Sequence, residues 1–471
     1  MVSSFHTFQD DALGTSDAVE LSQRLRRREL SLSEVTQAAI NRTKKADEIL
    51  RTCANTDFAK ALDRSHHETL IDTPFSGVPT FIKDNLIAKG FKTGFGSAAV
   101  TPKLETKNDP YVSQFRALGF NVLGKSVLPE FGFNATTEPA HDRPTLNPWN
   151  LAFSNGASSG GAAALVASGA VPIAHANDGG GSIRIPAACC GLVGLKPSRG
   201  RHVKPTAARV LPIDILSDGV VTRSVRDTAY FFHCAEGVYQ NKKLRPIAHL
   251  LTAGKRRLRV GLVLESASGD PTHPEVAQAT ERCASVLSEL GHHVEPTRFA
   301  LDESFVHDFP LYWAMLAFLT AKTGRFTCGE HFDASKMDNL SKGLIKHYRA
   351  NMLQTPRALF RLKQNAHRYL SAFKRYDVLL SPVLSQPPRP IGELSPDVSF
   401  DLLFSRLSAY VGFTPPANVA GSPAISLPGG LSSDHTPIGL QLSANIGRED
   451  TLLELAYALE EAMPWKSLYE I

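Results

Sequence analysis

Hydrophobic positions along the 471-residue chain follow two patterns that alternate from one end to the other. Short apolar runs, which predict strands, cover residues 77–86, 121–124, 258–264 and 376–382. Apolar residues that recur every three or four positions predict amphipathic helices at 16–28 and 31–45, and further helices are predicted at 109–117, 162–169, 273–290 and 448–463. Strands that alternate with helices are typical of an α/β fold. We therefore expect a mixed, twisted central sheet covered by helices on both faces, because short apolar strands of this kind are buried on both sides.

Serine residues mark the predicted starts of the first two helices. Ser16 precedes the first helical pattern, and Ser31 or Ser33 precedes the second, with Glu34 in its first turn. A serine hydroxyl in this place accepts a hydrogen bond from a free backbone N–H group of the first turn. The proline-rich stretch 386–396 predicts a surface loop, and the chain shows no internal repeat.

Composition limits the classes of partner. With 42% hydrophobic residues the chain can bury a large core. The net charge is only +5 and the basic clusters at 24–28 and 255–257 are short, so we expect no nucleic-acid partner. No apolar run reaches the roughly 18 residues of a membrane span, and residues 1–14 lack the apolar core of a signal peptide. We therefore expect no membrane partner.

The cysteines and histidines indicate neither disulfides nor a metal site. The 6 cysteines show no C-x-x-C spacing, and the adjacent Cys189 and Cys190 lie in an apolar run, as core thiols do. These features favour a reduced, cytoplasmic protein. The 16 histidines show no metal-ligand spacing, so we expect no metal and no other cofactor.

Three consecutive glycines, Gly179, Gly180 and Gly181, stand between apolar stretches and are followed at once by Ser182. Consecutive glycines do not belong in the middle of a helix or strand, so this segment predicts a tight turn inside the core. Backbone N–H groups without side-chain cover can hold an oxyanion, and a serine beside them is a candidate nucleophile. The alternative is a flexible loop or a hairpin tip.

Two further segments carry candidate chemistry. A second glycine and serine cluster, residues 154–161, leads into a short predicted helix and places Ser158 and Ser159 near its start. Lys83 follows an apolar strand-like run, where its amine cannot easily reach water. Taken singly, the serines are better explained as helix caps, and the lysine as a surface residue whose stem lies along apolar neighbours.

Together these segments resemble the amidase signature family of serine hydrolases. The matching motifs lie at 77–85, 156–161, 178–197, 418–428 and 437–442. The resemblance implies that Ser182 is the nucleophile, Ser158 a bridging serine after a cis peptide bond, and Lys83 the base. Ala157 stands where the family usually has glycine.

The resemblance spans nearly the whole chain. It implies a single domain over 1–471, with a signature core at about 72–212 and a variable, substrate-lining region at about 302–369. Nylon cyclic-dimer hydrolases share the features of residues 175–186, and related amidases cleave aryl carbamates. We therefore expect a small amide, anilide or carbamate as the substrate, and a monomer or homodimer.

The chemistry expected of these residues is acyl transfer. Lys83 takes a proton from Ser158, Ser158 takes one from Ser182, and Ser182 attacks the carbonyl carbon. The N–H groups of residues 179–182 hold the oxyanion, and water then cleaves the acyl-enzyme. Lysine acts as a base only when neutral, so its pKa must be lowered by burial or by nearby cations.

Two flanking features complete the expected site. Asp178 and Arg184 predict an ion pair that braces the glycine turn. In the aromatic stretch that contains Tyr312, Trp313 and Phe318, we expect either a core helix or a pocket wall, at even odds. Cys328 is either a packed thiol, which we favour, or a residue of the pocket.

Three other functions each fit part of the sequence. Residues 156–160 match the G-x-S-x-G nucleophile elbow of α/β-hydrolases, with Ser158 as nucleophile, but the preceding residues 149–155 predict only a weak strand. A glutaminase subunit of a tRNA-dependent amidotransferase fits the family, yet the aromatic stretch around Trp313 does not suit glutamine. A binding module without catalysis does not explain why all three active residues are present.

Overall fold

Each apolar run and each helical pattern predicted from the sequence is a strand or a helix in the protein, seen here in a computed structural model that describes residues 3–67 and 72–470. The first two residues of the stretch 1–14, in which the sequence predicts no signal peptide, lie outside the described residues. The helices are α1 (Ala18–Arg26), α2 (Leu32–Leu50), α3 (Phe58–His67), α4 (Pro110–Arg116), α5 (Gly160–Ala167), α6 (Arg184–Cys190), α7 (Val225–Val238), α8 (Pro274–Glu289), α9 (Phe305–Thr327), α10 (Asn339–Asn351), α11 (Thr355–Ser371), α12 (Phe400–Tyr410), α13 (Pro415–Ala420) and α14 (Glu449–Ala462).

The strands include several that the hydrophobic pattern did not predict. They are β1 (Cys53–Thr56), β2 (Pro79–Lys83), β3 (Lys92–Thr93), β4 (Lys103–Leu104), β5 (Asn121–Ser126), β6 (Leu146–Asn147), β7 (Asn150–Ser154), β8 (Ile173–Asp178), β9 (Val193–Lys196), β10 (Ser217–Thr222), β11 (Arg259–Val263), β12 (His293–Thr297), β13 (Val378–Pro382), β14 (Ala424–Leu431) and β15 (Pro437–Ala444).

The central sheet is mixed. Its eight strands run in the order β12-β11-β13-β15-β14-β9-β10-β8, with parallel pairs around β11 and antiparallel pairs elsewhere. A second sheet, β1-β5-β2, lies against the β8 edge, where the Thr80 hydroxyl donates to the Ile173 carbonyl at 2.9 Å. Strands β2 and β8, which are far apart in sequence, therefore lie side by side.

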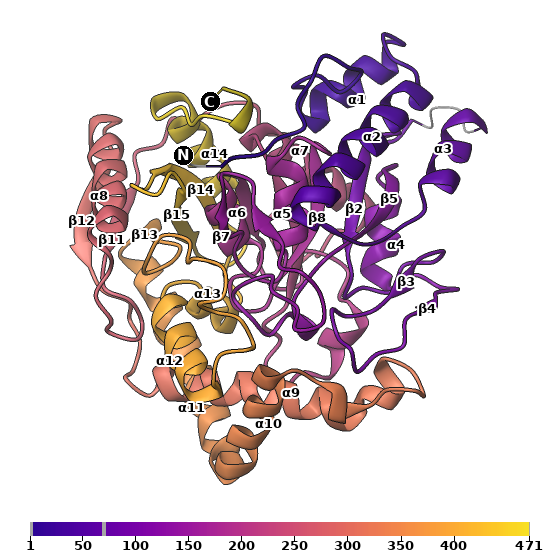
Figure 1. Cartoon of the computed structure of the whole chain (residues 1–471). Helices are drawn as coiled ribbons and strands as arrows, with labels where there is room; N and C mark the ends of the chain where they lie inside the picture. Colours follow the sequence, from indigo (N-terminus) through magenta and orange to yellow (C-terminus); the bar gives the residue numbers. More distant parts are fainter. Residues whose placement is uncertain (1–2, 68–71, 471) are drawn as a thin grey trace.

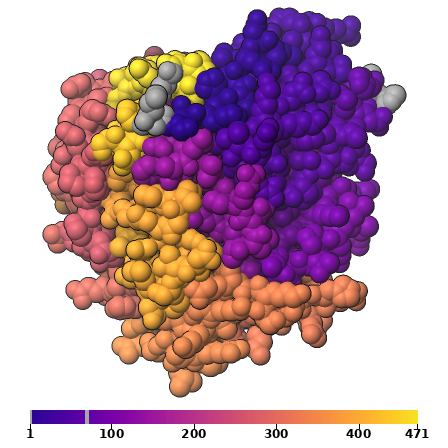
Figure 2. Space-filling model, viewed as in Figure 1, coloured from indigo at the N-terminus to yellow at the C-terminus, as the bar shows by residue number. Residues whose placement is uncertain are grey.

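Helices flank the central sheet (Figure 1). Helix α6 packs against β9, β14 and β15, α7 packs against β9 and β10, and α8 and α14 pack against β14 and β15. Helices α9 to α11, coral to orange in Figure 2, form one end of the molecule. Their apolar residues belong to a second core cluster, separate from the large one around the sheet. The expected α/β architecture is confirmed.

Helix starts follow local polar chemistry, with one correction. Ser31 and Glu34 form a full capping box at the start of α2, in which each side chain bonds the backbone N–H group of the other residue. The prediction that Ser16 caps α1 is wrong, because Asp17 accepts from the Glu20 N–H group at 2.9 Å instead. Among the described residues, no helix is both long and apolar enough to cross a membrane.

Candidate active site

The glycine turn joins β8, at the edge of the central sheet, to helix α6. Gly181 has φ +140°, a backbone conformation that side chains rarely adopt. A Cβ atom there would lie 2.5 Å from both Ile185 Cδ1 and Thr414 Oγ1. Glycine is therefore required at this position both for its backbone conformation and for space.

The sequence predicts that the backbone N–H groups of residues 179–182 are all free, but in the structure one of them is not. The Gly181 N–H group donates to Asp178 Oδ1 at 2.8 Å, so that part of the oxyanion-hole prediction is corrected. In the described part of the chain, no group accepts from the N–H groups of Gly179, Gly180 or Ser182. These three donors remain candidates to hold an oxyanion.

Asp178 and Arg184 form the expected ion pair, and both side chains are fully buried. Arg184 donates to the two carboxylate oxygens through Nε and Nη2, each at 2.9 Å. Burial alone would raise the pKa of Asp178, but the Arg184 guanidinium outweighs it and lowers the pKa to about 2. Arg184 also reaches Gln441 and Asn418, at 2.7 and 2.6 Å, so one guanidinium ties the turn to β15 and α13.

Lys83 is the last residue of β2 and is fully buried. Its Nζ lies 2.6 Å from Ser158 Oγ, 3.0 Å from Ser159 Oγ and 2.7 Å from Asn177 Oδ1. Burial lowers the pKa of Lys83 to about 7, although nearby carboxylates oppose the change. A substantial share of the amine is therefore neutral near neutral pH.

The three contacts of the neutral amine can be assigned by what each partner is able to donate. A neutral amine has two N–H hydrogens and one lone pair. The Asn177 Oδ1 atom only accepts, and the Ser159 hydroxyl already donates to the Asn177 carbonyl at 3.3 Å. The Ser158 hydroxyl is then the group that faces the lone pair of Lys83.

The link between Ser158 and Ser182 differs from the expected relay. The Ala157–Ser158 peptide bond is trans, not cis. The Ser158 N–H group points at Ser182 Oγ, 3.3 Å away, while the Ser158 hydroxyl points at Lys83. A hydrogen bond between the two serine hydroxyls is not among those formed by the described residues.

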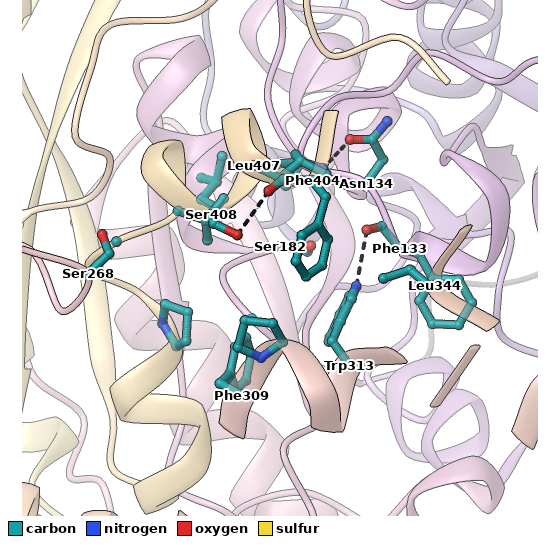
Figure 3. A pocket seen from close by; sticks show the side chains of 18 of the residues that line it. Phe133, Asn134, Ser182, Ser268, Phe309, Trp313, Leu344, Phe404, Leu407 and Ser408 are labelled. Carbon is teal, nitrogen blue, oxygen red and sulfur yellow. Dashed lines mark hydrogen bonds between the residues drawn. The ribbon is translucent and has the colours of Figure 1, made fainter. Parts of the chain in front are cut away.

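An apolar cavity of about 160 Å³ opens above Ser182, between the glycine turn and helices α9, α10 and α12 (Figure 3). Trp313 stands in its wall, with its indole Nε1 donating to the Phe133 carbonyl at 3.2 Å. The large apolar residues of the wall are Phe133, Ile185, Phe305, Phe309, Trp313, Leu340, Leu344, Phe404 and Leu407. Among the described residues, none that lines the cavity carries a charge.

Two aromatic residues expected in the pocket lie outside its wall. Tyr312 is buried and its hydroxyl donates to the Ile213 carbonyl. The Phe318 ring packs on Tyr348, with centroids 5.0 Å apart. Successive residues of a helix turn by about 100°, so Tyr312 and Phe318 point about 100° and 140° away from Trp313.

Cys328 closes α9 as a partly buried, packed thiol and does not line the cavity. Among the wall residues that the sequence analysis missed, Phe305 and Phe309 precede Trp313 at spacings of eight and four, a helical repeat that could have identified them. Phe133 and Phe404 come from distant segments, and no local pattern indicates them.

The fold and the relatives define the class of the protein, an amidohydrolase that cleaves C–N bonds. The family model for amidases matches residues 34–453, so the chain belongs to the amidase signature family. The Mycobacterium tuberculosis protein AmiC, an amidase by its name, is 44% identical over 469 residues, covering 99% of each chain.

Relatives with more specific names are also similar over nearly their whole length. The 6-aminohexanoate-cyclic-dimer hydrolase of Paenarthrobacter ureafaciens is 34% identical over 478 residues, 95% of each chain. A solved structure of such a hydrolase with its substrate superposes with a TM-score of 0.83 at 31% identity, over 97% of this chain and 98% of that one. A bacterial aryl acylamidase superposes with a TM-score of 0.84 at 25% identity, over the same shares of the two chains.

Proposed function

We propose that this amidase hydrolyses small, uncharged amides, anilides or carbamates with an apolar acyl or amine part, through an acyl-enzyme on Ser182. The observation that carries the proposal is the contact of the buried Lys83 amine with Ser158, beside Ser182, at the foot of an apolar cavity. A lysine with a pKa of about 7 can accept a proton at working pH.

The proposed reaction begins with two proton transfers toward Lys83. Neutral Lys83 takes the Ser158 proton, Ser158 takes the Ser182 proton, and Ser182 Oγ bonds to the substrate carbonyl carbon. For the second transfer, the Ser158 hydroxyl must turn toward Ser182 when substrate binds. The N–H groups of Gly179, Gly180 and Ser182 stabilise the oxyanion. The proton returns through the same groups to the leaving nitrogen, and water cleaves the ester.

The uncharged wall argues against the glutaminase alternative. Free glutamine carries an ammonium and a carboxylate, and burying either without a charged partner is costly. The nucleophile-elbow alternative is also weak, because Ser158 contacts a lysine and the strand before it, β7, pairs with β6 in a two-stranded sheet outside the central sheet. A single domain, a cytoplasmic location and a monomeric or homodimeric state are further proposals that rest on the sequence.

The test is kcat/KM against pH on a chromogenic anilide, for wild type, Lys83→Ala, Lys83→Arg and Ser158→Ala. Wild-type activity should rise as pH passes about 7, because Lys83 must lose its proton. Lys83→Ala should cost at least ~10² in rate, the usual contribution of a general base. Lys83→Arg should be nearly as damaging, because guanidinium stays protonated.

In the same series, Ser158→Ala should leave slow residual turnover, because the nucleophile and the backbone donors remain in place. Near wild-type activity in Lys83→Arg would show that Lys83 is a charge anchor and not the base.

A further inference from the structure

A buried histidine and a buried aspartate follow one another in a hydrogen-bonded chain that starts at the Lys83 backbone, and neither residue lines the cavity. The Lys83 backbone N–H group donates to His175 Nδ1 at 3.1 Å. His175 Nε2 in turn lies 3.2 Å from Asp218 Oδ1. The His175 side chain is 1% exposed and that of Asp218 is 3% exposed. They reach this place from adjacent antiparallel strands, β8 and β10.

The hydrogen bonds fix the tautomer of the histidine. A backbone N–H group can only donate, so Nδ1 must be the unprotonated nitrogen of the ring. The hydrogen then sits on Nε2 and is donated to the Asp218 carboxylate. Burial lowers the pKa of His175, which keeps the ring neutral. A neutral histidine therefore joins the backbone of Lys83 to a carboxylate.

Two carboxylates act on Lys83, those of Asp178 and Asp218, and among the described residues no lysine or arginine pairs with Asp218. Asp178, on β8, is paired with Arg184, and Lys125, on β5, is paired with Asp84. Besides Lys83, the titratable groups that face the pair are Lys125, Tyr111 and His202 around the imidazole, and Asp109, before α4, and Tyr111 around the Asp218 carboxylate. Among the described residues, the neutral imidazole of His175 is the hydrogen-bond partner of the Asp218 side chain.

We propose that His175 and Asp218 are a positioning pair for the lysine base, in which the imidazole anchors the Lys83 backbone and the Asp218 carboxylate orients the imidazole and places a negative charge beside this anchor. This inference rests on the proposed role of Lys83. Both side chains act through Lys83 and neither reaches the cavity.

The experiment compares Asp218→Asn with wild type in kcat/KM against pH. Asparagine can still accept from His175 Nε2, so the variant removes the charge and keeps the hydrogen bond. The charges of Asp178 and Asp218 both favour the protonated form of Lys83, Asp178 more strongly. Removing the charge of Asp218 should therefore move the acid limb to lower pH by about one unit, the low end of the shift that one nearby opposite charge causes. One unit below the wild-type midpoint, activity relative to each enzyme's own plateau should then rise about fivefold.

Asp214→Asn is the matched control. Its carboxylate lies four residues away and pairs with Lys204, so the profile of this variant should stay in place. A limb that does not move in Asp218→Asn, or that moves equally in Asp214→Asn, would overturn the inference.

A second pair of variants tests whether His175 anchors the Lys83 backbone, and this test can be made even if Asp218→Asn fails to fold. His175→Gln can accept from the Lys83 N–H group and donate to Asp218, whereas His175→Leu can do neither. We expect His175→Leu to lose about tenfold in kcat at unchanged KM, and His175→Gln to recover most of it, because only leucine leaves a buried N–H group without an acceptor. Equal activity in the two variants would reject the anchor.

Lys83→Arg in the same assay separates the two proposals. If Lys83→Arg is active, the lysine is not the base and the proposed function fails. If Lys83→Arg is inactive and Asp218→Asn leaves the limb unmoved, the proposed function stands and the positioning pair is rejected.

Discussion

Arg184→Met should destabilise the protein far more than the loss of an ordinary ion pair. Arg184 and Asp178 are both fully buried, and methionine fills the space without the charge. Removing one partner of a buried pair typically costs about 3–5 kcal/mol, because the other charge is left uncompensated. An independent figure comes from Asp178, whose pKa of about 2 lies below its ordinary 3.8 and corresponds to about 2 kcal/mol.

The pH dependence of this loss follows from the sign of the pKa shift. The folded-state pKa of Asp178 is lowered, so its contribution is fully present above about pH 4, the pKa of the unfolded chain, and is lost as pH falls through about 2. In Arg184→Met, burial without the guanidinium should raise this pKa. The difference in stability should therefore be widest at pH 7 and above and narrow toward pH 4.

The assay is urea unfolding followed by tryptophan fluorescence at pH 7.5 and pH 4. Arg368→Met is the matched control, because the Arg368–Asp302 pair is half exposed on both sides and should contribute less than about 1 kcal/mol. The claim that the Asp178–Arg184 pair stabilises the glycine turn is refuted if the free energy of unfolding of Arg184→Met at pH 7.5 lies within about 1 kcal/mol of that of wild type and the variant keeps its activity.

Two further pairs of variants test the cavity and the turn. Trp313→Ala should raise KM for an apolar anilide about tenfold or more, since one buried aromatic side chain contributes about 1.5–3 kcal/mol. Phe318→Ala should lower the thermal unfolding midpoint and leave KM unchanged. Equal KM values in the two variants would show that α9 does not bind substrate. Gly181→Ala should abolish activity, because the added Cβ atom would lie 2.5 Å from its nearest neighbours. Gly180→Ala should fold normally, because its nearest neighbour lies 3.5 Å away. An active Gly181→Ala variant would contradict the claim that the turn requires glycine at this position.

Local chemistry made much of the fold readable from the sequence. The capping box of Ser31 and Glu34 acts within one helical turn, so four residues suffice to predict it. The cap of α1 is Asp17 and not the predicted Ser16, because serine and aspartate can both cap a helix and the backbone geometry decides which of two neighbours does so. Strands β8, β9 and β10 were not predicted, because polar residues or glycines interrupt their apolar runs, although all three strands are buried in the sheet.

The site was predictable where a motif carried it and not where distant segments meet. Lys83, Ser158 and Ser182 were chosen from three separate motifs, and the structure brings them into one hydrogen-bonded group. The N–H group of Gly181 is taken by Asp178, three residues earlier, a contact that depends on the shape of the turn. The His175 and Asp218 pair joins strands that are 43 residues apart, so no spacing in the sequence indicates it.

The central claim is that Ser182 forms the acyl-enzyme, and covalent labelling tests it most directly. The protein would be treated with a fluorophosphonate that reacts with activated serines, then digested and mapped by mass spectrometry. We expect the adduct on Ser182 in wild type, strongly slowed labelling in Lys83→Ala, and no adduct in Ser182→Ala. An adduct on Ser158 in wild type, with undiminished labelling in Ser182→Ala, would contradict the account and make Ser158 the nucleophile.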